Sequence, residues 1–116
     1  MAAGHVLVVV RDRELRAHCC DALSATGFRV TTSESEEGAR YALEFLHPQP
    51  PDVLVFSIQE PLSDSLMDAV RRASSRPVLA VVEPLEDAHR RKRPGPVAVV
   101  KEALKQRGQR RTVMND

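Results

Sequence analysis

Short apolar runs alternate with amphipathic stretches along most of the chain, and this pattern predicts the secondary structure. Residues 5–10, 53–58 and 77–82 are almost entirely apolar and rich in valine, which is typical of strands buried on both faces. Residues 28–32 alternate apolar and polar side chains, which indicates a shorter strand nearer the edge of a sheet. The apolar run at residues 97–100 predicts a short fifth strand.

Helical periodicity and capping signals fill the segments between the first four runs. Asp12 is a suitable N-cap for a first helix, and Gly27 is placed to end it. Residues 33–37 offer overlapping capping signals for a second helix, and a third helix is expected to begin near Asp64. The order strand, helix, strand, helix therefore holds over the first two thirds of the chain.

The last third of the chain carries weaker signals. Residues 83–96 hold few apolar side chains and several helix-breaking prolines, so at most one or two helical turns are expected there. A short last helix is expected over residues 101 to about 107. The overall prediction is an α/β domain with a five-stranded, doubly wound parallel sheet and shortened fourth and fifth helices. Residues 1–108 would form this domain, and residues 109–116 a loose basic tail.

Charge is strongly segregated along the sequence. Residues 1–87 contain eight arginines, no lysine and fourteen acids, a net charge of −6. Residues 88–116 contain nine basic residues and two acids, a net charge of +7. An asymmetry of this kind indicates a basic segment with a preference for an acidic partner.

Composition narrows the function classes. At 42% hydrophobic and 28% charged residues the chain is typical of globular proteins, and no apolar run approaches the ~20 residues of a membrane span, so a cytoplasmic location is expected. Glycine-rich phosphate loops, metal-ligand spacing and catalytic triads are absent from the sequence, so we expect no enzyme, cofactor or metal. The adjacent Cys19 and Cys20 do not fit a disulfide; we expect Cys19 to fill the core and Cys20 to lie near the surface.

One segment points to a family. The run from Pro51 to Pro61 resembles the third strand of a response-regulator receiver domain, in which a phosphate-accepting aspartate is followed four residues later by proline. Pro77 before the fourth apolar run and Lys101 after the fifth are similar to further receiver features. The resemblance covers about residues 5–107 and implies a CheY-like, flavodoxin-type fold.

The same resemblance implies a degenerate phosphorylation pocket. Where receivers carry two acids that hold Mg²⁺, this sequence has Val10 and Arg11, with Asp12 one residue further. Neither a serine hydroxyl at the acceptor position nor valine at the sensing position can perform the receiver's aspartyl chemistry. We therefore interpret the chain as a pseudo-receiver without aspartyl phosphorylation. The positions that match the pocket are Val10, Arg11, Asp12, Ser57, Val82 and Lys101.

Three of these positions also have a purely structural interpretation. Asp12 fits a helix cap as well as a metal ligand. Ser57 fits a small residue at the end of a strand as well as a target for a serine/threonine kinase. Lys101 fits an ion pair with a nearby acid, as a remnant of ancestry.

Two function classes remain open. The first is a protein-interaction module in bacterial signal transduction or transcription regulation, which would bind an acidic protein through its basic surface. A homodimer is a further partner that this class allows. The second is an auxiliary nucleic-acid-binding domain that uses the same basic segment. Aromatic residues are only 3% of the chain and none lies in that segment, which disfavours base stacking. The expected partner-binding residues are Arg90, Arg91, Lys92, Arg93, Lys105 and Arg107, although the run at 90–93 also fits a solvated loop.

Overall fold

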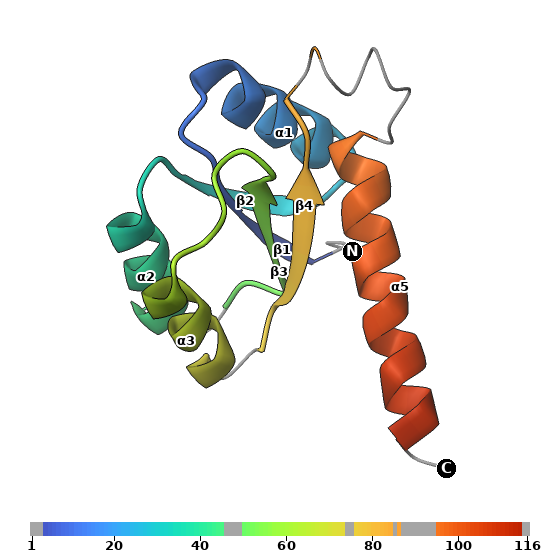
Figure 1. Ribbon diagram of the computed structural model, residues 1–116. Helices are drawn as coiled ribbons and strands as arrows, with labels where there is room; N and C mark the ends of the chain where they lie inside the picture. Colours follow the sequence, from blue (N-terminus) through green and yellow to red (C-terminus); the bar gives the residue numbers. More distant parts are fainter. Residues whose placement is uncertain (1–3, 46–49, 74–75, 85, 87–94, 115–116) are drawn as a thin grey trace.

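The computed structural model describes residues 4–45, 50–73, 76–84, 86 and 95–114, with the backbone alone for residues 107–114 (Figure 1). Strands and helices alternate through the first four strands, as the hydrophobic pattern predicts. The elements are β1 (His5–Val9), α1 (Arg13–Ala25), β2 (Arg29–Ser33), α2 (Glu36–Phe45), β3 (Val53–Ser57), α3 (Asp64–Arg72), β4 (Val78–Val82) and α5 (Pro96–Met114).

The four strands form one parallel sheet in the order β2-β1-β3-β4. β1 lies between β2 and β3, with Val6 opposite both Val30 and Val53. The alternating strand, β2, lies at one edge, which confirms its predicted position. At the other side β4 pairs with β3 in a register that places Val82 opposite Ser57.

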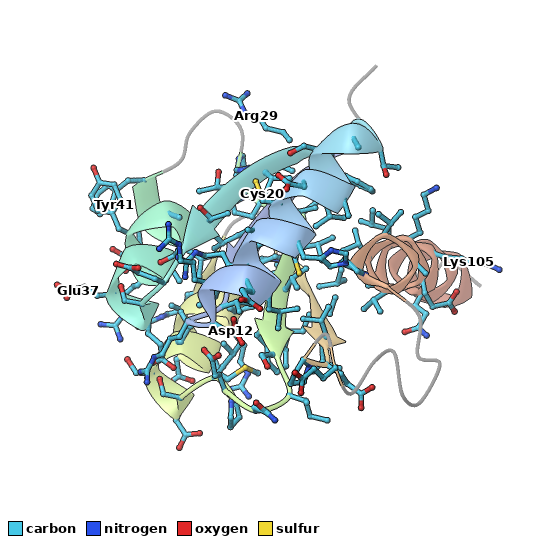
Figure 2. The ribbon with its side chains drawn as sticks, turned by 90° about the horizontal axis from the view of Figure 1, so that it is seen from above. Asp12, Cys20, Arg29, Glu37, Tyr41 and Lys105 are labelled. Atoms are coloured by element: carbon cyan, nitrogen blue, oxygen red, sulfur yellow. The ribbon has the colours of Figure 1, made fainter. Side chains whose placement is uncertain are left out.

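Helices cover both faces of the sheet, so the doubly wound arrangement is confirmed (Figure 2). Alternate residues of each strand point to opposite faces. In β1, Val6 and Val8 pack toward α1 and α5, whereas Leu7 and Val9 pack toward α2 and α3. The helices contribute further buried side chains to these two layers, among them Leu15, Cys19, Leu23 and Val100 on the first face and Ala39, Leu43, Leu66 and Val70 on the second.

The predicted fifth strand is wrong, because Val97–Val100 form the first turns of α5. The helix begins at Pro96, where a missing backbone N–H costs nothing, and the Val99 N–H donates to the Gly95 carbonyl at 3.1 Å. Val100 is fully buried against the α1 face of the sheet. A short apolar run fits a buried helix turn as well as a buried strand, and here it covers the sheet instead of extending it.

The last helix also differs in length from the prediction. α5 has 19 residues and runs to Met114, so it is not shortened, and it includes most of the expected tail at residues 109–116. The expected domain boundary at residue 108 stays a prediction. Most of the segment expected to hold a short fourth helix, residues 87–94, lies outside the described residues. Within the described residues, none of the helices combines the length and the apolar character needed to cross a bilayer.

Candidate functional site

The predicted pocket positions Val10, Ser57 and Val82 come together at the carboxyl ends of the strands. Ser57 ends β3 and is opposite Val82, and Val10 directly follows β1 next to them. In open parallel sheets, ligands bind outside this edge. Val10 is fully buried, and Ser57 and Val82 are nearly so, so this part of the edge is closed by packed side chains.

Ser57 is held by its own turn. Its side chain and backbone are only 1% exposed, and its Oγ accepts a hydrogen bond from the Gln59 N–H at 3.2 Å. Its carbonyl accepts from the Glu60 N–H at 2.9 Å, and the Val82 carbonyl accepts from the Ile58 N–H at 2.9 Å. These bonds fix the residue as a small, buried end of the strand, which agrees with the structural interpretation of Ser57.

The loop between β1 and α1 is closed by a carboxylate from the loop after β3. Glu60 accepts hydrogen bonds from the backbone N–H groups of Arg11, at 2.7 Å, and Asp12, at 3.4 Å. Arg11 and Glu60, which form the shorter of these bonds, are 49 residues apart in the sequence. Glu60 thus supplies an internal anion to backbone donors at the edge where receivers bind their charged ligands.

The carbonyl groups of the same loop are bound by an arginine. The Arg16 guanidinium donates to the carbonyls of Val10, at 2.9 Å, and Arg11, at 3.1 Å. The second terminal nitrogen of Arg16 lies 3.8 Å from a carboxylate oxygen of Glu34, a weak ion pair because the Glu34 side chain is largely exposed. Together with Glu60, Arg16 pairs the polar backbone groups of the loop within the chain itself.

Asp12 acts as the predicted helix cap. Its Oδ1 accepts from the backbone N–H groups of Glu14, at 3.0 Å, and Leu15, at 3.3 Å, and so satisfies two donors of the first turn of α1. Among the described residues, His, Cys, Asp and Glu side chains form no group of three that is able to hold a metal ion.

A small cavity of about 280 Å³ lies beside this edge, between β1, the start of α2 and the loop after β3. Arg11 contributes one positive charge, whereas Glu34, Glu36 and Glu60 contribute three carboxylates. The pKa of Glu36 lies below its usual range, first because the Ser63 hydroxyl donates to it and then because the Ser63 N–H does. Three acidic side chains against one arginine make the cavity unfavourable for a phosphoryl group.

Lys101 does not lie at the end of a strand, which corrects the prediction. It is an exposed residue of α5, because the apolar run before it is helical. Its side chain takes part in neither of the ion pairs found among the described residues. Lys101 therefore does not follow a fifth strand, as the comparison with the receiver lysine had led us to expect.

The predicted partner-binding residues are only partly described. Lys105 is exposed on α5 and points away from the sheet (Figure 2). Arg107 follows on the same helix, but its side chain lies outside the described residues, as do Arg90, Arg91, Lys92 and Arg93. The proposed basic surface stays a prediction.

Comparisons with known proteins support the fold. No known family model matches the chain, and no curated protein matches it. The beryllofluoride-activated receiver domain of NtrC is 26% identical, with a TM-score of 0.56 over 91% of this chain and 98% of that one. The receiver domain of NtrC4 from Aquifex aeolicus is 19% identical, with a TM-score of 0.54 over 86% of this chain and 78% of that one.

A response regulator from Desulfuromonas acetoxidans is 12% identical, with a TM-score of 0.55 over 96% of this chain and 98% of that one. All three likenesses span most of both chains. The protein therefore has the fold of response-regulator receiver domains, with four parallel strands in its described residues. Its function has to be argued from its site, because a fold alone does not determine one.

Proposed function

We propose that this protein is a receiver-like domain that acts in bacterial signal transduction through protein interactions, without aspartyl phosphorylation. The observation that carries the proposal is Ser57, a buried serine at the end of β3, where the resemblance to receivers expects the acceptor aspartate. A serine hydroxyl does not form the acyl phosphate of an aspartate. We propose no enzymatic activity for it.

The surroundings of Ser57 support the same conclusion. Mg²⁺ requires oxygen ligands, usually carboxylates, and the first strand is followed by Val10 and Arg11 where receivers carry acids. The carboxylate of Asp12 is engaged in capping α1, and that of Glu60 binds the backbone of the same loop. The edge is thus stabilised by contacts within the chain and needs no phosphoryl group to hold it together.

The interaction role rests on charge. The net charge of +7 in residues 88–116 would attract an acidic protein surface. Lys105 of α5 belongs to this segment and is exposed to solvent. Regulation of transcription is the signalling output that we propose for this contact. Such a contact gains mainly in association rate, so it should weaken as salt shortens the Debye length toward about 8 Å.

Intact-mass spectrometry after incubation with acetyl phosphate and Mg²⁺ tests the first half of the proposal. We expect no addition of a phosphoryl group, while the NtrC receiver domain, run in parallel, serves as the positive control. A phosphorylated species of this chain would overturn the proposal.

A pull-down from bacterial extract tests the second half. The triple variant Arg90→Glu, Arg91→Glu, Arg93→Glu should lose most of the captured partner, whereas Arg29→Glu, an exposed charge reversal on β2, should not. Unchanged capture by the triple variant contradicts the basic surface. A duplex DNA probe at low salt tests the nucleic-acid alternative in the same series.

A further inference from the structure

Two of the four tyrosine and phenylalanine side chains of this chain are exposed together on α2. Tyr41 is 65% exposed and Phe45 is 60% exposed, and their ring centroids are 4.8 Å apart. Tyr41 projects away from the sheet, on the side of the molecule opposite Lys105 (Figure 2). A pair of large aromatic side chains outside the core is typical of a protein-contact surface.

A groove of about 510 Å³ lies at the other side of α3. It is bounded by α3, by the start of β4 and by α5, and its apolar lining includes Met67, Val70, Leu79 and Ala103. Its volume lies within the ~300–1,000 Å³ of pockets that hold small molecules, and so exceeds the space that a single side chain needs. The groove is therefore large enough to receive protruding side chains.

The two surfaces carry opposite charges. α2 contains three glutamates and one arginine, and Glu37 is exposed beside the aromatic pair. The groove is lined by Arg71 and Arg76 and by no acidic residue among the described ones. Arg71 is partly neutralised by Asp68 at 3.0 Å, which leaves Arg76 as the arginine we expect to face a negative partner.

One copy of the chain cannot bring these two surfaces together. α2 packs on α3, and α3 lies between α2 and the groove (Figure 1). We infer that the protein associates with a second copy of itself, with the aromatic pair Tyr41 and Phe45 of one copy inserted into the groove of the other. This contact is independent of phosphorylation, and the groove lining includes none of the predicted partner-binding residues, so it stands or falls separately from the proposed function.

Light scattering coupled to size-exclusion chromatography tests the inference on the full chain. The apparent mass should rise from 12.9 kDa toward at least twice that value as the concentration increases. The double variant Tyr41→Ala, Phe45→Ala should raise the dissociation constant at least ~10-fold, since aromatic anchors dominate such contacts. Ile58→Ala removes another exposed apolar side chain, outside both surfaces, and should leave the association unchanged.

Complementation provides the sharper test. Arg76→Asp reverses the charge of the groove and should also weaken self-association, while circular dichroism confirms that both variants are folded. A mixture of the aromatic-deficient variant with Arg76→Asp still offers one intact groove and one intact aromatic pair, so it should form a mixed complex. A wild-type chain that stays monomeric at millimolar concentration overturns the inference. The inference is also overturned if neither variant weakens the association, or if the mixture of the two variants remains monomeric.

Discussion

The two ends of the sheet are built differently. At the carboxyl ends of β1 and β3, the polar groups of the loops are paired within the chain, mainly through Glu60 and Arg16. At the start of β4, apolar side chains and arginines instead surround an open groove. The comparison shows that hydrogen bonds within the chain close the loops at the carboxyl edge, whereas an open groove lies at the opposite end of the sheet.

The largest expected loss of stability is that of a variant at Ser57, and this variant tests whether the carboxyl edge is closed to water. Ser57→Asp buries a carboxylate at a position that is 1% exposed, so we expect the free energy of unfolding to fall by roughly 2–4 kcal/mol at neutral pH. Urea denaturation measures this loss. Ser57→Ala, which loses only the hydroxyl, should cost about 1 kcal/mol. Equal stability of Ser57→Asp and the wild type would show that the edge is open to water.

Glu60 tests the internal anion at the same edge. Glu60→Ala removes the acceptor of the Arg11 and Asp12 N–H groups and should cost about 0.5–1.5 kcal/mol, with faster hydrogen exchange at these two amides. Glu102→Ala, an exposed acid of α5, is the matched control and should change neither. Unchanged exchange at Arg11 in Glu60→Ala would contradict this role.

Arg76 tests the other end of the sheet. It has a positive φ of 46°, a conformation that costs an ordinary residue roughly 1 kcal/mol more than glycine. Arg76→Gly should therefore stabilise the fold by about 0.5 kcal/mol after the added flexibility of the unfolded chain is included. Arg72→Gly, placed in the last turn of α3, should instead destabilise it by up to ~1 kcal/mol. Thermal denaturation of both variants should show shifts of opposite sign.

The smallest effect concerns the link between α2 and α3. Because Ser63 holds the pKa of Glu36 below its ordinary value of 4.5, the ionised form stabilises the folded state. This contribution is present above the ordinary pKa and is lost as the pH falls through the lower, folded-state value. The stability difference between wild type and Glu36→Gln should thus shrink from about pH 7 to about pH 3. A difference that is constant over this range would rule out the pairing.

The sequence predicts most of this fold because its first four strands and first three helices carry consistent local signals. Asp12 as a cap and Cys19 as a core residue are both confirmed, and burial raises the pKa of the Cys19 thiol to about 11, with a smaller contribution from Cys20. The prediction of a strand at residues 97–100 is wrong because a run of only four apolar residues has no periodicity that separates a strand from a helix.

The internal pairing at the carboxyl edge could not be predicted in the same way. Glu60 binds a loop 49 residues away, and nothing local in the sequence links the two. Its place in the loop after a buried strand was the one available signal, since the carboxyl ends of parallel strands meet at one edge. The groove likewise combines residues of α3, β4 and α5, so it exists only in the folded chain.

The central claim is that this receiver fold does not use its phosphorylation chemistry, and an NMR titration of the ¹⁵N-labelled chain with Mg²⁺ and beryllofluoride tests it most directly. Beryllofluoride mimics the phosphoryl group of an active receiver, so the titration reports on the pocket without requiring a kinase. We predict that the amide signals of residues 10–12 and 57–60 do not shift at saturating reagent. Saturable shifts clustered at these residues would contradict the account.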